Sequence, residues 1–162
     1  MAFNVNNAYR GNWGASDLIN ADTVTLIKDE WKIIGEIVIP ADQLVGLGYG
    51  GIGTQDAAPG RLYVDLKDNA TTPAPIKGQF RIEIMSSNDM PLGGRPVLID
   101  YDLATTSLGA VNRTERLPMS FSNIVLSKDK KFVFKVKNTA ATAQTLSRAN
   151  SKVEIDVTKQ LV

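Results

Sequence analysis

Apolar and polar residues alternate along several short segments of this chain, and this alternation limits the fold more than any other feature of the sequence. In one segment Phe80, Ile82 and Ile84 alternate with Arg81 and Glu83. Successive side chains of a β-strand point to opposite faces of a sheet, so a strand here has one buried and one solvated face. A helix would need apolar residues at intervals of three and four positions. The segment therefore predicts a strand that covers a hydrophobic core.

Similar segments recur along the chain, separated by residues that are typical of turns. They are rich in Val, Ile, Thr and Trp, which suit a pleated, half-buried strand. We expect about eight strands, at residues 23–28, 31–39, 61–66, 79–85, 97–101, 119–126, 131–137 and 152–158. Parallel α/β folds are disfavoured because no segment predicts a crossover helix. The sequence predicts an all-β fold, an antiparallel β-sandwich or barrel that is jelly-roll-like, in a single domain at 22–162.

The segment 131–137 has a clear alternation and an excess of lysine. We expect Phe132, Phe134 and Val136 to face inward, and the residues between them, including Val133, to face outward. The lysines of this hairpin are Lys128, Lys130, Lys131, Lys135 and Lys137. They could contact phosphates, but exposed lysines on an edge strand also prevent unwanted sheet pairing. We favour the second interpretation.

Three long connections are expected between the strands, at 41–60, 103–117 and 138–150, the last as a loop or a short helix. In the first, Gly46, Gly48 and Gly51 match the G-x-G-x-x-G pattern of dinucleotide sites. That site needs a strand before the glycines and a helix after them. Here Pro59 and Gly60 lead directly into the next expected strand. The pattern therefore indicates a flexible surface loop or one that a partner orders.

Residues 1–21 are rich in Asn, Gly and Ala and show no clear period. Phe3, Tyr9 and Trp13 are spaced along this polar segment. One interpretation is a frayed terminus. The other is an extended N-terminal arm whose aromatic side chains bind pockets on a neighbouring subunit.

The composition excludes several classes of function. The chain has no cysteine and no histidine, which excludes disulfides, thiolate nucleophiles, common zinc sites and histidine acid–base pairs. Its net charge of +1 lacks the basic surplus of a protein that coats nucleic acid, although a local patch stays possible. No targeting segment is visible, and the apolar run at 33–39 is too short to span a membrane. We expect a soluble protein that is made in the cytosol and has no cofactor.

Some polar residues match weak functional patterns. Asp100 and Asp102 form a D-x-D pair whose side chains point the same way, but the rest of a calcium loop is missing. We expect solvated acids at a strand end. Arg113, Glu115 and Arg116 form a mixed cluster, either in a solvated loop or at the rim of a subunit interface. A pair of glycosidase carboxylates is disfavoured, because any two of the 17 acidic residues could be chosen.

In style, the sequence as a whole resembles virion structural proteins, in particular the decoration (cement) proteins of viral capsids. The features that carry the resemblance are the arm at 1–20, the glycine-rich loop at 44–60 and the alternating strands. The resemblance implies a small β-domain in the virion that clamps neighbouring subunits, often as a trimer. It implies homo-oligomers and a major capsid protein as partners, with no nucleic acid or membrane. The expected interface residues are Phe3, Tyr9, Trp13, Tyr49, Arg113 and Arg116.

Two other classes of function stay open. The chain could be a self-assembling jelly-roll capsid subunit, or a filament subunit, in which arms are exchanged between identical copies. It could also be a carbohydrate-binding or small hydrolytic β-sandwich. The first alternative predicts large particles from the purified chain, and the second predicts saturable binding of one sugar or of calcium.

Overall fold

The computed structural model describes residues 9–13, 21–47, 61–90, 92, 97–103, 114–116 and 125–161. Within these residues the regular secondary structure is entirely β, in twelve strands. Their bounds are β1 Tyr9–Trp13, β2 Thr23–Leu26, β3 Trp31–Val38, β4 Gln43–Leu47, β5 Arg61–Asp65, β6 Gly78–Ser86, β7 Val97–Asp102, β8 Thr114–Arg116, β9 Val125–Leu126, β10 Lys130–Asn138, β11 Gln144–Ser147 and β12 Lys152–Leu161. The all-β fold class that the sequence predicts is confirmed.

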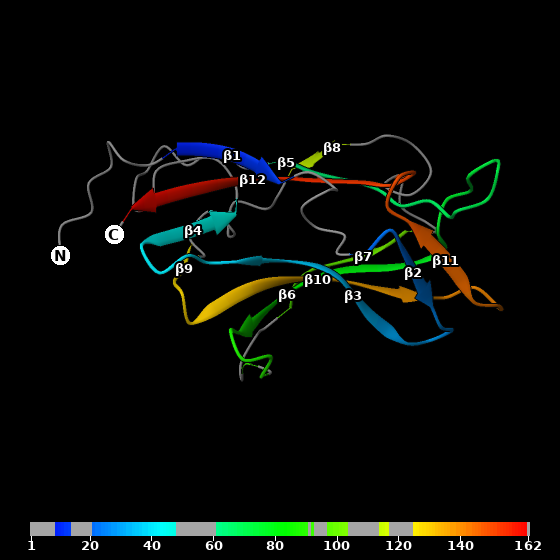
Figure 1. The fold of residues 1–162 in the computed structure, drawn as a ribbon, viewed down its shortest axis with the longest axis horizontal. Helices are drawn as coiled ribbons and strands as arrows, with labels where there is room; N and C mark the ends of the chain where they lie inside the picture. The colour runs from blue at the N-terminus through cyan, green and yellow to red at the C-terminus, as the bar shows by residue number, and fades with distance from the viewer. Residues whose placement is uncertain are drawn as a thin grey trace.

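One layer of the sandwich is a four-stranded sheet with the order β3-β10-β6-β7 (Figure 1). All three strand pairs are antiparallel. The late strand β10 lies between β3 and β6, and its Lys135 pairs with Ile33 on one side and Arg81 on the other. β10 is therefore a central strand with a partner on both edges.

The second layer is a six-stranded sheet in which β12 is the common strand. The order is β8-β5-β12-β4-β9, and β1 also pairs with β12. Val157 of β12 pairs with Gly11 of β1 and with Leu47 of β4, so these two strands flank β12 on opposite edges. The first and last described strands of the chain thus lie side by side in this layer (Figure 1).

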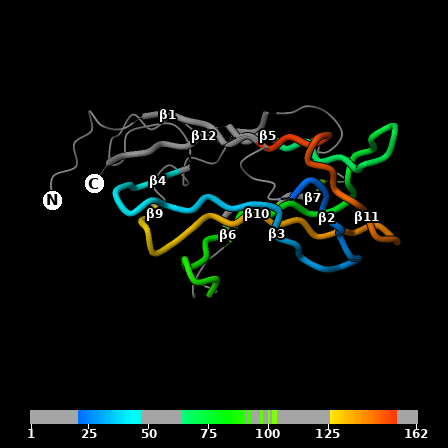
Figure 2. Tube along the Cα trace, viewed as in Figure 1, coloured from blue at the N-terminus to red at the C-terminus, as the bar shows by residue number. Residues whose placement is uncertain are grey.

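The chain crosses between the layers repeatedly. Figure 2 follows it from β3 in the lower layer to β4 in the upper layer, and later from β9 back down to β10. In both sheets strands distant in sequence lie side by side, as in a jelly roll built from Greek keys. The architecture is therefore a jelly-roll-like β-sandwich.

A single hydrophobic core joins the sheets. The rings of Phe80 and Phe134, both fully buried, have their centroids 6.2 Å apart. The core also includes Val45, Val64 and Val153 from the six-stranded sheet, Ile34, Ile37, Ile82, Phe132 and Val136 from the four-stranded sheet, and Val24, Leu26 and Leu146 from the third sheet. Burial of a Leu, Ile or Phe side chain contributes about 1.5–3 kcal/mol, so these contacts supply most of the stabilising free energy.

A β-bulge interrupts the edge strand β3. Phe134 of β10 pairs with Gly35 and the next residue, Lys135, pairs with Ile33, so Ile34 is the extra residue. Ile34 and Gly35 are both buried in succession, which breaks the strict alternation of the strand. A bulge of this kind bends an edge strand and limits its pairing with other chains.

The third sheet is the antiparallel pair of β2 and β11, attached to the rest by Asn138 at the end of β10. Asn138 is fully buried. Its Nδ2 donates to the carbonyl oxygens of Leu26 at 2.8 Å and Thr142 at 2.9 Å, while its Oδ1 accepts from the amide of Ala140 at 2.8 Å and from Gln144 Nε2. One side chain thus connects β10 to both strands of the small sheet.

Several predicted loops contain strands. β4 lies within 41–60, β8 within 103–117 and β11 within 138–150, where a loop or a short helix was expected. Each has three to five residues, too few to show a period, and is held by distant partners. Of the predicted strand 119–126, only β9 falls within the described residues.

The interpretation of the lysine-rich strand as an edge strand is wrong, because β10 lies between β3 and β6. Val133 and Lys131, both expected to be exposed, are buried. Val133 lies between two strand partners, Glu36 of β3 on one edge and Glu83 of β6 on the other. The turn after β6 also packs against the start of β10. Phe132, Phe134 and Val136 are buried as predicted.

Five residues of the expected N-terminal arm form β1, which pairs with β12 of the same chain. Residues 1–8 and 14–20 lie outside the described residues. The arm and its boundary at residue 21 therefore stay a prediction.

Candidate interface surfaces

The interface residues predicted from the sequence are only partly within the described chain. Tyr9 and Trp13 are the first and last residues of β1, where they pair with Lys159 and Ile155 of β12. Arg116 ends β8 and pairs with Arg61 of β5. β1 and β8 belong to the same six-stranded sheet, which brings three of the predicted residues into one layer. Phe3, Tyr49 and Arg113 lie outside the described residues, and the interface role of all six stays a prediction.

The outer face of the four-stranded sheet carries a network of ion pairs. Arg81 Nη2 donates to Asp100 Oδ2 at 2.7 Å, and Arg81 Nη1 lies 3.4 Å from Glu83 Oε1. Lys135 Nζ donates to the other oxygen of Glu83 at 2.6 Å. The strand register causes this arrangement, because Lys135, Arg81 and Asp100 are direct neighbours on β10, β6 and β7. The charges in this network neutralise one another on a preformed surface.

Trp31 at the start of β3 extends this network. The Arg81 guanidinium carbon lies 4.0 Å from the centre of the Trp31 ring, and Lys137 Nζ lies 5.2 Å from it. Both distances are within the range of cation–π attraction. The ring face that Arg81 covers is therefore not open for stacking on a sugar, which weighs against a carbohydrate platform at this position.

Lys131 anchors a turn at one end of the same face. Its Nζ contacts Glu36 Oε2 and donates to Asp89 Oδ1 at 2.6 Å. Burial alone would lower the pKa of Lys131, but the hydrogen bonds and charges of Asp89 and Glu36 outweigh it, so the pKa is raised. The turn is closed by Ser86 Oγ, which accepts from the Met90 amide at 2.9 Å. Met90 is thus held on an ordered turn with 63% of its surface exposed.

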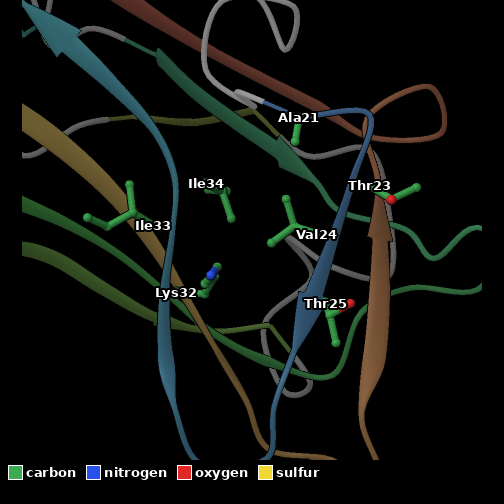
Figure 3. Close-up of a pocket in the computed structure, with 7 residues that line it drawn as sticks. All are labelled: Ala21, Thr23, Val24, Thr25, Lys32, Ile33 and Ile34. Carbon is green, nitrogen blue, oxygen red and sulfur yellow. The ribbon is translucent and has the colours of Figure 1, made fainter.

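A groove lies between β2 and β3 (Figure 3). Its volume is about 400 Å³, and it is lined by Ala21, Thr23, Val24, Thr25, Lys32, Ile33 and Ile34. Val24 and Ile34 point toward each other across the space between the strands, whereas Ile33 points to the other side of β3 (Figure 3). The groove therefore has an apolar floor with threonines and one lysine along its sides.

No metal site appears among the residues that the structure describes, since no three Asp or Glu side chains of that part converge. Asp100 of the predicted D-x-D pair is bound to Arg81. Asp65 lies 3.2 Å from Lys67, and Asp68 accepts the amides of Ala70 and Ala74 within its own loop. These acids act as structural partners. The described chain also contains no helix long and apolar enough to cross a membrane.

The chain is similar in fold to capsid proteins of a bacteriophage. A solved complex of VP16 and VP17, the two major capsid proteins of bacteriophage P23-77, matches with a TM-score of 0.56 and 8% sequence identity, over 96% of this chain and 99% of that chain. VP17, a capsid protein of the same phage, matches with a TM-score of 0.52 and 11% identity, over 99% of both chains. No protein-family model matches the sequence, and no relative is found among curated proteins. At these identities the likeness to the P23-77 proteins establishes a shared fold.

The ion-pair network and the groove were not predicted from the sequence. The alternation of Arg81 with apolar neighbours indicates that it faces outward, and the same holds for Glu83 and Lys135. Which of these residues meet depends on the strand order, and strand order is set by distant pairings that a single sequence does not reveal.

Proposed function

We propose that this protein is a structural component of a virus particle and forms part of its protein shell. One observation carries this proposal: the fold matches that of a complex of two major phage capsid proteins over 96% of this chain and 99% of that chain. A shared fold alone does not determine function, so the surface of this chain must supply further support.

The surface chemistry supports a role in assembly. On the outer face of the four-stranded sheet, cations and carboxylates are already paired within the chain. A partner can therefore cover this face without leaving these charges buried and unpaired, which would be costly. Large apolar side chains are exposed as well: Ile27, Ile33, Val38, Met90 and Val97. Exposed apolar side chains around a neutral polar centre are suited to contact with other subunits.

Within this class, we place the role of a shell subunit ahead of that of a decoration protein. The sequence alone favoured decoration, but the full-length likeness to major capsid proteins supports a subunit that builds the shell itself. The proposed partners are further copies of the chain and, as in the VP16–VP17 complex, a second capsid protein. The proposed location is the virion.

Light scattering combined with size-exclusion chromatography tests the proposal, followed by electron microscopy of the largest species. A shell subunit is expected to form oligomers that grow with concentration and assemble into particles or sheets. A decoration protein is expected to stay a small oligomer. A chain that stays monomeric at all concentrations and binds one saccharide saturably on a glycan array would contradict both roles.

A further inference from the structure

We propose that the outer face of the four-stranded sheet binds the same face of a second copy of the chain, across a two-fold axis that runs perpendicular to the strands. This contact rests on the proposed shell function and identifies how two subunits bind each other. Three observations support it: exposed apolar side chains at the borders of the face, the order of charges along its strands, and the accessibility of those charges.

Three of the five large apolar side chains that are exposed in the described chain lie on this face. Residues that are directly opposite in adjacent strands point to the same side of a sheet. Ile33 and Val38 of β3 pair with lysines of β10, and Val97 of β7 pairs with Glu83. Figure 3 shows Ile33 pointing away from the groove between β2 and β3. The exposed fractions are 40% for Ile33, 58% for Val38 and 38% for Val97, so both edges of the face offer apolar surface.

The charges on this face alternate in sign along the strands. One row across the sheet contains Lys135 and Arg81, which are opposite each other on β10 and β6. The next row, two residues away along β10, contains Glu36 and Glu83 on either side of Val133. Rows two residues apart on a strand are separated by about 7 Å. A row of cations therefore lies beside a row of carboxylates.

This order of charges favours a second copy of the same face as the partner. A two-fold rotation about an axis between the two rows places the cations of each copy over the carboxylates of the other. Arg81 of one copy then faces Glu83 of the second copy, and the reverse contact forms as well. An unrelated partner would need the same two rows at the same spacing in the opposite order. The face is therefore complementary to itself.

The charged groups stay accessible although they are paired within the chain. The side chains of Glu36, Arg81 and Asp100 are 29%, 24% and 39% exposed. A carboxylate accepts about four hydrogen bonds, whereas Glu83 accepts one at each oxygen, from Lys135 and Arg81. A further bond across the interface can form while the internal pairs persist. The charges thus keep a partner both in the free chain and in the dimer, which limits the cost of covering them.

The size of the face predicts a weak contact. Four strands that are about 4.8 Å apart, with nine residues in β10, give a face of about 500–600 Å². Two such faces bury about 1,100 Å² in total, which is close to the lower limit of about 1,000 Å² for a specific interface. We therefore expect an isolated dimer to dissociate readily, and the many linked contacts of a shell to strengthen it.

Sedimentation velocity of the full-length protein over a concentration series tests this contact. In the proposed arrangement, position 33 of one copy faces Glu36 of the second copy. Ile33→Glu should therefore raise the dissociation constant of the dimer at least about tenfold, whereas Ile33→Lys should change it less than about threefold. Inside one chain the preference is reversed, because position 33 lies beside Lys135. Urea denaturation should thus show Ile33→Glu to be at least as stable as Ile33→Lys.

Ile27 offers a matched control. It is 54% exposed and lies in the turn before β3, outside the four-stranded sheet. Ile27→Glu and Ile27→Lys change the net charge by the same amounts as the two substitutions at position 33. Both should leave the dissociation constant within about twofold of the wild-type value.

The outcomes separate the two proposals. If the wild-type protein associates but Ile33→Glu associates equally well, or if both substitutions at position 33 weaken association equally, the two-fold contact is wrong and the shell function stands. If the wild-type protein stays monomeric at every concentration, the proposed shell function itself fails, and the two-fold contact with it.

Discussion

At the scale of single residues, a few buried polar groups fix how the sheets meet. Asn138 is the clearest case, because its side-chain amide makes four hydrogen bonds, and two of them, to Leu26 of β2 and Gln144 of β11, link β10 to the small sheet. Removing one partner from a buried hydrogen bond leaves the other unsatisfied, and this costs more than the bond itself contributes.

We expect Asn138→Ala to destabilise the protein by about 2–4 kcal/mol, because it leaves the carbonyl of Leu26 without its donor inside the core. Urea denaturation followed by circular dichroism measures this change. The neighbouring exposed Thr139 supplies a control, since Thr139→Ala should change the stability by less than about 0.5 kcal/mol. Equal effects of the two substitutions would show that the Asn138 network is not important for stability.

A glycine is required at position 78 because there is no room for a side chain there. A Cβ atom at this position would lie 2.2 Å from the carbonyl oxygen of Lys137 on the paired strand. Because the obstacle is backbone, Gly78→Ala must push β6 away from β10, and we expect a loss of about 2 kcal/mol or more. Thermal unfolding compares it with Lys77→Ala at the exposed neighbouring position. A Gly78→Ala variant as stable as the control would mean that the strands separate at little cost.

Lys131 makes the free energy of unfolding depend on pH in the alkaline range. Its pKa is higher in the folded state than in the unfolded chain. The stabilising contribution is therefore complete below the ordinary lysine pKa of about 10.4 and is lost as pH rises through the higher folded-state value. We expect the stability difference between wild type and Lys131→Met to shrink above that pH. A pH series of urea midpoints measures this difference, and a constant difference would contradict the ion-pair role.

At the scale of secondary-structure elements, the sequence predicts those strands whose own pattern repeats. Phe80 and Ile82 in β6, and Phe132 and Phe134 in β10, show period two over enough residues to indicate both strand and inward face. β11 is different, because Leu146 is its only large apolar residue and its strand form depends on pairing with β2. The position of Lys131 could not be predicted, since its burial depends on a turn from another strand pair.

Deletions at the N-terminus separate the predicted arm from β1. Deletion of residues 1–8 leaves β1 intact, so the stability should change by less than about 0.5 kcal/mol while assembly is reduced. Deletion of residues 1–13 removes five residue pairs with β12. It should lower the stability by about 2 kcal/mol or more. Urea denaturation and light scattering measure the two effects. Assembly of the shorter deletion at the wild-type level would show that residues 1–8 are not an arm.

At the scale of the whole molecule, one core connects all three sheets. No sheet can lose its packing without exposing the others, so we expect a single cooperative unfolding transition. The two tryptophans report on different layers, Trp13 on the six-stranded sheet and Trp31 on the four-stranded sheet. Fluorescence of Trp13→Phe and Trp31→Phe should therefore give the same urea midpoint as circular dichroism of each variant. Separate midpoints for the two layers would indicate that the sheets unfold independently.

The pairing of β1 with β12 has a consequence for the topology of the backbone. Tyr9 and Lys159 are opposite residues in this pair, so their Cα atoms are separated by only about 5 Å. The two ends of the segment from Tyr9 to Lys159 therefore lie next to each other. A circular permutant could join the chain near Lys159 to the chain near Tyr9 and place its new termini in the exposed 71–74 turn. We expect this permutant to keep the same strand neighbours.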